Sequence, residues 1–140
     1  MELKSKYTEL CATLNLAVAD FEIAMGADFS KYDALEIDWI KNAQIQKFEF
    51  SIELLCKTAK VYLESVEEKI YTPKLCIKSL FLLKIIDEDS YLKLMDCLVS
   101  RNHLSHIYKF EMFDLIQKEL PNHLAVIKHT AMVLSNLEIL

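Results

Sequence analysis

Turn-forming residues are scarce in this sequence, and their scarcity restricts the fold more than any other feature. The 140 residues include one glycine and two prolines, whereas a protein with many strands needs such residues at its tight turns. Hydrophobic residues make up 53% of the chain, enough for a well-filled core and unlike a disordered segment. We therefore predict one all-α domain over residues 1–140, an antiparallel, up-and-down bundle of about five helices.

The spacing of the apolar residues predicts where these helices lie. They cover about 2–25, 34–66, the stretch that begins at 73, 87–106 and about 110–137. Gly26 follows the first of them and is placed to end it in a left-handed cap.

Local signals mark the starts of the later helices. Thr72 is the expected N-cap of the third, with Pro73 at its first position, where a missing N–H is harmless. Either Asp87 or Asp89 caps the fourth helix. Pro121 should kink or restart the last helix, because proline removes one backbone bond and clashes with the preceding turn.

The second and longest segment has apolar residues on two sides when it is stepped at about 100° per residue. One stripe contains Ile37, Ile40, Phe48, Ile52, Leu55 and Tyr62, and the other contains Trp39, Phe50, Leu54 and Val61. A helix of this kind is central in a bundle or lies at a subunit interface, and we expect the protein to be homodimeric.

We expect a soluble, cytoplasmic protein without a membrane segment. The apolar runs are interrupted by lysine and fall short of the roughly 20 residues that a membrane span needs, and the first residues, MELKSKYTEL, contain no apolar signal segment.

Four cysteines, spaced without a CxxC pair, are expected to be reduced packing residues: Cys11, Cys56, Cys76 and Cys97. The net charge of −5 argues against a broad nucleic-acid surface but permits a small local site.

The segment RNHLSHIY, residues 101–108, carries the most informative side chains. Arg101 is the only arginine of the chain, and the other basic residues are lysines. Its planar fork of donors fits a phosphate in a way that lysine cannot reproduce. His103 and His106 follow within five residues, and histidine can transfer protons near neutral pH. Arginine with histidine suits metal-independent RNA cleavage, although cations at a helix C-terminus also interact favourably with the last carbonyls.

Geometry restricts how these residues could cooperate. Arg101 and His106 are five residues apart, so on a continuous helix they diverge by about 140°. Either the helix ends between them or a second copy of the chain supplies one partner. His103 and His106 have the spacing of a metal pair, but no nearby cysteine or carboxylate completes it, so we expect no metal site and no cofactor.

An acidic pair lies on the second helix. Glu49 and Glu53 are one turn apart and could be interpreted as an acid pair. Lys57 follows Glu53 at i+4, and an ordinary surface ion pair between these two is the prediction we favour.

Two separate motifs resemble one known family. Residues 101–108 match the R-x-x-x-x-H-x-Y motif of HEPN domains of the HepT type, and IQKFEFSIELLCKTAKVYLE, residues 45–64, is similar to a segment of the nucleotidyltransferase substrate-binding proteins, a branch of that group. The resemblance extends from about residue 34 to the C-terminus. It implies a five-helix homodimer in which two copies of the motif face a shared cleft.

The resemblance also implies roles for residues and partners. Members of this kind pair with a minimal nucleotidyltransferase (MNT) in toxin–antitoxin systems, where the HEPN protein is the ribonuclease toxin. By this likeness Arg101 and His106 are the catalytic pair, Asn102 is the polar residue that follows the arginine, and His103 is a possible accessory. Tyr108 is the expected acceptor of AMP, which the nucleotidyltransferase adds to neutralise the toxin. The alternative is a non-catalytic subunit that binds substrate for the nucleotidyltransferase.

Overall fold

A computed structural model describes residues 2–70, 72–106 and 110–139. Five α-helices and one short 3₁₀ helix make up the regular structure of these residues, and no strand occurs among them. The elements are α1 (Glu2–Met25), η1 (Phe29–Lys31), α2 (Ala34–Ser65), α3 (Pro73–Leu82), α4 (Glu88–His106) and α5 (Phe110–Ser135). The prediction of an all-helical bundle is confirmed.

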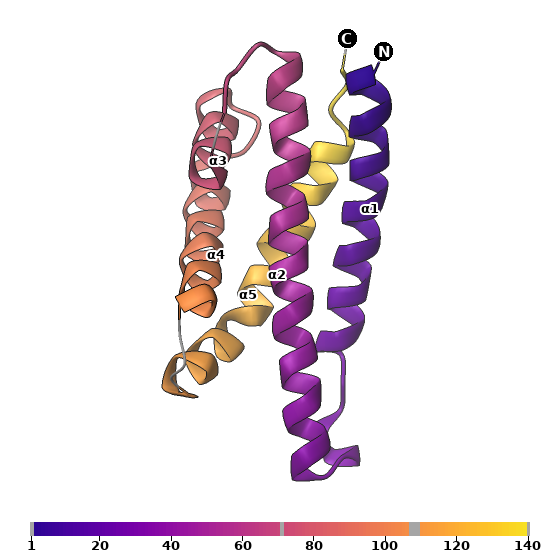
Figure 1. Ribbon diagram of the computed structural model, residues 1–140, viewed down its shortest axis with the longest axis vertical. Coiled ribbons are helices and arrows are strands. Elements are labelled where there is room, and N and C mark those ends of the chain that lie inside the picture. Colours follow the sequence, from indigo (N-terminus) through magenta and orange to yellow (C-terminus); the bar gives the residue numbers. More distant parts are fainter. Residues whose placement is uncertain (1, 71, 107–109, 140) are drawn as a thin grey trace.

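The long helix α2 stands in the middle of the bundle (Figure 1). It packs against α1 on one side, α3 and α4 on the other, and α5, which crosses behind it. Helices α1, α2, α4 and α5 alternate in direction, and the two chain ends lie at the same end of the molecule. No helix in the described part of the chain is long and apolar enough to cross a bilayer.

Side chains from all five helices form the main core. Its fully buried members include Leu14, Phe21, Phe48, Ile52, Leu55, Leu63, Ile77, Leu80, Leu94, Leu120, Ile127 and Leu134. Of the first apolar stripe of α2, Phe48, Ile52 and Leu55 are fully buried here. Of the two positions predicted for this helix, central or at a subunit interface, the structure shows the central one. The second stripe is divided, because Leu54 and Val61 are buried whereas Trp39 and Phe50 are 60% and 54% exposed.

Predicted helix starts are confirmed in detail. The Thr72 hydroxyl accepts a hydrogen bond from the Leu75 amide at 3.2 Å, with Pro73 in the first turn. Of the two candidates for α4, Asp87 is the cap, since its carboxylate accepts a bond from the Ser90 amide at 2.8 Å.

The prediction for Gly26 is wrong. Helix α1 does end at Met25, but Gly26 does not have a positive φ. Its amide donates to the carbonyls of both Glu22 and Ile23, which continues the hydrogen bonding of the last helical turn. Left-handed residues occur instead after α2 and α3, at Glu67 (φ 64°) and Lys84 (φ 62°). The restart considered at Pro121 is also wrong, because α5 runs continuously through this exposed proline.

Candidate functional site

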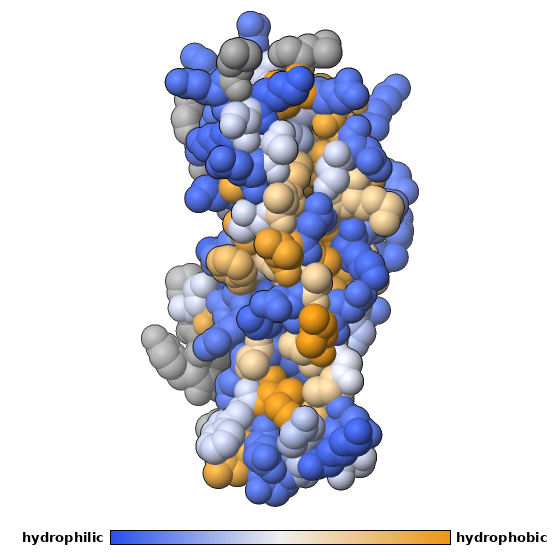
Figure 2. Space-filling view, turned by 90° about the vertical axis from the view of Figure 1, so that its right-hand side faces the viewer, coloured by the Kyte–Doolittle hydropathy of each residue, from blue (hydrophilic) through white to orange (hydrophobic). Residues whose placement is uncertain are grey.

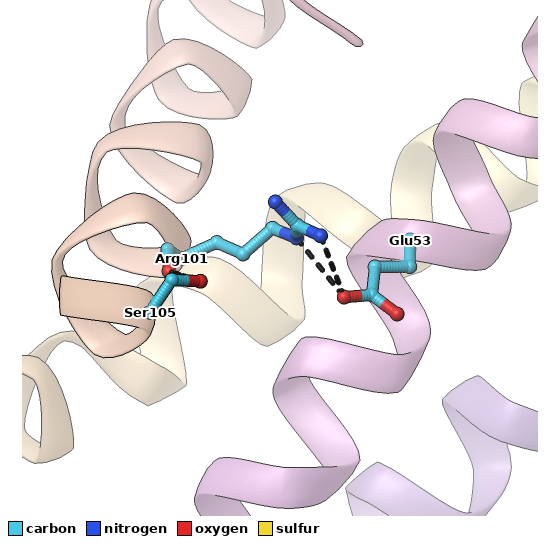
Figure 3. A network of polar contacts seen from close by, with 3 residues as sticks. All are labelled: Glu53, Arg101 and Ser105. Atoms are coloured by element: carbon cyan, nitrogen blue, oxygen red, sulfur yellow. Dashed lines mark hydrogen bonds and ion pairs between the residues drawn. The ribbon is translucent and has the colours of Figure 1, made fainter.

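Arg101 lies on α4, in the helical turns that precede its C-terminal end, and its side chain reaches across to α2 (Figure 3). The guanidinium donates two hydrogen bonds to one oxygen of Glu53, with Nε 3.1 Å and Nη2 2.8 Å from Oε1. Both side chains are partly exposed, at 30% for Arg101 and 49% for Glu53. The pair therefore joins two helices at the surface and remains accessible to solvent.

The partner of Glu53 differs from the prediction. We expected an ion pair with Lys57 on the same helix, whereas the structure pairs Glu53 with Arg101, 48 residues away. Arginine offers two donors in a fixed geometry to one carboxylate oxygen, which the single ammonium of lysine cannot match. Glu49 is close enough to be affected, because burial and the charge of Glu53 raise the pKa of its carboxyl while Arg101 partly opposes them.

Donors remain on Arg101 after this contact. A guanidinium has five N–H groups, and Glu53 engages one on Nε and one on Nη2. The edge formed by Nη1 and the second Nη2 hydrogen can still donate hydrogen bonds to the oxygens of an anion. Glu53 thus orients the guanidinium and leaves three of its five N–H donors for another partner.

The other motif residues lie along α4 beyond Arg101. Asn102 and His103 are exposed, and His106 is the last residue of the helix. The side chain of His106 and the whole of Tyr108 lie outside the described residues, so the roles predicted for them stay predictions.

Helix α4 nevertheless answers one question about the motif. It continues through His106, so it does not end between Arg101 and His106, and that way of bringing the two together within one chain is wrong. Positions five apart on a helix diverge by about 140°, and Arg101 faces α2. Of the two arrangements considered, the contribution of a second copy remains.

A cavity of about 260 Å³ opens beside the Arg101–Glu53 pair, between α2, α3 and α4. Its lining consists of Ile52, Glu53, Cys56, Lys57, Lys60, Thr72, Pro73, Cys76, Leu98 and Arg101. The arginine singled out by the sequence therefore borders a hollow that can hold part of a ligand.

The four cysteines are buried and free, as predicted. Burial raises the pKa of the Cys56 thiol to about 12 and that of Cys76 to about 11. Although both line the cavity, they are protonated at neutral pH and serve as apolar wall. The described residues hold no group of three or more histidine, cysteine or acidic side chains that could bind a metal ion.

Sequence reasoning missed one buried polar pair next to the motif. Ser100 Oγ and His123 Nε2 share a hydrogen bond of 2.8 Å, and the imidazole stacks on Phe48 with 4.9 Å between ring centroids. His123 is 3% exposed, and burial lowers its pKa. The available signal was its position in the buried stripe of α5, between Leu120 and Ile127. Both side chains are buried, so this pair is part of the core.

Comparison with known protein families identifies the family of this chain. A family described as "Nucleotidyltransferase substrate binding protein like" matches residues 10–136, which includes both motif segments. No curated protein matches the chain.

Proposed function

Since the chain belongs to the nucleotidyltransferase substrate-binding proteins, the HepT-like HEPN family, we propose that it is the ribonuclease toxin of a toxin–antitoxin pair, acting without a metal ion on RNA in the cytoplasm. Its antitoxin is then a minimal nucleotidyltransferase. The family supports a partnership with a nucleotidyltransferase, and the site supports the chemistry.

The observation that carries the proposal is the state of Arg101. The only arginine of the chain is fixed by Glu53 along one edge, is partly exposed, and keeps its other edge for an anion. A guanidinium in this state can bind two non-bridging oxygens of a phosphodiester and stabilise the charge that grows on them during cleavage.

The reaction follows from this assignment. His106 removes the proton from a ribose 2′-OH, the 2′-oxygen attacks the adjacent phosphorus, and the P–O5′ bond breaks to leave a cyclic phosphate. The leaving 5′-oxygen takes a proton from an imidazolium, so the proton balance closes. Exposed Asn102 supplies an amide for substrate contacts, and His103 is available as an accessory cation on the same helix.

We also propose that the protein is a homodimer. Leu92 and Val99 on α4 are 54% and 52% exposed, and His106 follows Val99 by seven residues, so the three positions share one helix face. Pairing two copies through this face buries the apolar side chains and brings the histidine positions of the two copies to the interface. We expect a total buried area of about 2,000 Å² or more, as in obligate dimers.

Neutralisation then acts on Tyr108. A phenol becomes a good nucleophile only when a base or metal of a partner enzyme activates it. Transfer of AMP from ATP to its oxygen releases pyrophosphate and tethers a phosphodiester near the catalytic motif, where it competes with RNA for Arg101.

A non-catalytic, substrate-binding subunit is the second candidate. The contact that favours it is the Arg101–Glu53 ion pair, which already neutralises the arginine in a chain whose net charge is −5. Such a protein would hold substrate for the nucleotidyltransferase without cleaving it.

Expression of the chain alone in bacteria separates the two. A toxin arrests growth, and Arg101→Lys and His106→Ala both relieve the arrest by lowering RNA cleavage at least about 100-fold while the fold is kept. Unchanged toxicity of Arg101→Lys would contradict the role of the guanidinium.

Intact-mass analysis after co-expression with the nucleotidyltransferase should show one added AMP, which Tyr108→Phe abolishes.

The dimer has its own test. Val99→Glu should yield a monomer by light scattering at micromolar concentration, because it places a charge in the proposed interface. The matched control is Ile23→Glu on α1, on the opposite side of α2 (Figure 1) and 75% exposed, more than Val99. A dimer lost in the control and kept in Val99→Glu would contradict the assignment of this face.

A further inference from the structure

The cavity between α2, α3 and α4 is lined mostly by residues outside the catalytic motif. Its floor is apolar and buried, with Ile52, Cys56, Cys76 and Leu98 each at most 9% exposed. Polar groups line the rest, among them Lys57, Lys60 and the hydroxyl-bearing Thr72. An apolar floor with a few convergent polar groups is the usual composition of a small-ligand site.

Positive charge is concentrated at this cavity. Arg101, Lys57 and Lys60 line it together with a single carboxylate, Glu53, although the whole chain has a net charge of −5. Glu53, Lys57 and Lys60 are spaced i, i+4 and i+7, so they project from one face of α2.

The two lysines are available to a ligand. In the described part of the chain the one acid of the cavity is engaged by Arg101, and neither Lys57 nor Lys60 forms an ion pair. Glu64 follows Lys60 by one turn but does not line the cavity. Both ammonium groups are therefore free to contact an anion held over the apolar floor.

We propose that this cavity is the subsite for one nucleotide of a single-stranded RNA, next to the phosphate that Arg101 holds. Lys57 and Lys60 bind the phosphate of that nucleotide, and its base lies against the apolar floor. This assignment rests on the proposed function of Arg101 and adds the part of the protein that positions the RNA.

Size and charge both favour a single nucleotide. A volume of about 260 Å³ is near the lower limit of small-molecule pockets, about 300–1,000 Å³, and suits one base with its phosphate. A base can enter such a hollow only when it is unstacked and unpaired, so single-stranded RNA fits and a duplex does not. The acidic remainder of the protein confines the contact to this local site.

The test measures binding without cleavage. The probe is a short, fluorescein-labelled RNA with 2′-O-methyl riboses, which cannot be cut because the attacking oxygen is blocked. Binding to the full-length protein is followed by anisotropy over a range of salt concentrations. Wild type is compared with Lys57→Gln/Lys60→Gln and with a control of equal charge change, Lys4→Gln/Lys6→Gln. The control positions are exposed on α1, which lies across α2 from α3 and α4 (Figure 1).

The cavity variant should bind RNA roughly tenfold more weakly. The slope of its salt dependence should fall by about 0.7, because the two lysines neutralise one phosphate of a single strand. The control should match the wild type. In NMR spectra, the probe should shift the amides of Thr72 and Cys76 more than amides of α1, which places the base in the cavity independently of charge.

Equal binding by the cavity variant and the control would overturn the proposal, as would a probe that leaves the Thr72 and Cys76 amides unshifted. Displacement of the probe by micromolar free AMP would also overturn it, because a free nucleotide would then be the occupant. The proposed ribonuclease function fails by a different result, toxicity that survives Arg101→Lys. RNA binding that depends on both lysines in a protein without cleavage activity would uphold the subsite and favour the substrate-binding alternative.

Discussion

Two neighbouring residues on α4 show how one helix serves both the core and the surface. Ser100 faces inward and shares a hydrogen bond with His123, a pair that is 9% and 3% exposed. Arg101 faces the cavity and pairs with Glu53, where both side chains remain partly open to water. The inner pair is neutral and sealed, and the outer pair is charged and accessible, so we assign structure to the first and chemistry to the second.

The two pairs should also differ in how much they contribute to the stability of the protein. A buried polar group that loses its partner has no water to replace it, whereas a half-exposed ion pair exchanges its contact for solvent at little cost. Stability should therefore depend on the inner pair and activity on the outer pair.

The largest expected effect is that of His123→Ala. It removes a buried ring that stacks on Phe48 and leaves the Ser100 hydroxyl without its partner, so we expect a loss of about 3 kcal/mol in the free energy of unfolding. Urea denaturation measures it. A loss below about 1 kcal/mol would mean that the core does not depend on this histidine.

The neighbours Ser100 and Arg101 give a direct comparison. Ser100→Ala deletes one oxygen but leaves a buried imidazole nitrogen unpaired, at a cost of about 1–3 kcal/mol. Arg101→Ala deletes a whole guanidinium from a partly exposed pair and should cost about 1 kcal/mol or less. The smaller truncation is thus expected to destabilise more, and the reverse order in urea denaturation would break the comparison.

The sequence predicted features that depend on local interactions better than features that depend on long-range contacts. Caps depend on neighbouring residues, so Thr72 and Pro73 were identified correctly, and the cap of α4 was narrowed to Asp87 or Asp89, of which the structure has Asp87. At Gly26 the expected left-handed cap does not form. The positive φ angles fall instead on Glu67 and Lys84, and neither glutamate nor lysine is a residue type that predicts a left-handed conformation.

For the site, the chemistry of Arg101 could be derived from its residue type and from the absence of any other arginine. Its partner could not, because the contact with Glu53 spans 48 residues and exists only once α2 and α4 pack. The same holds for the cavity, whose walls come from three helices. Packing also leaves some apolar residues exposed, among them Leu16 and Ile23 of α1. On the side of the molecule drawn in Figure 2, apolar and polar side chains are interspersed.

Acid should weaken the inner pair. Burial lowers the pKa of His123 in the folded protein, and the weaker opposing effects of Glu119 and Asp96 do not reverse this. The unfolded chain therefore binds a proton at a higher pH than the native protein does, so stability falls as the pH decreases through about 6.5 toward the lowered value. Urea denaturation from pH 7.5 to 5 should show this fall for wild type and a shallower one for His123→Gln. Parallel curves would exclude His123 as the cause.

The smallest effect on stability is expected for Glu53→Gln, which sharpens the description of the outer pair. The amide oxygen can still accept from Arg101, but the charge is gone, and because the pair is partly exposed the free energy of unfolding should change by about 0.5 kcal/mol or less. The electrostatic response is more informative. Glu53 is one of the causes that raise the pKa of Glu49, so the pKa of Glu49 should fall in the variant, as measured by NMR titration of its side-chain carboxyl. A pKa of Glu49 that stays unchanged would show that burial alone raises it, and that the two acids do not interact beside Arg101.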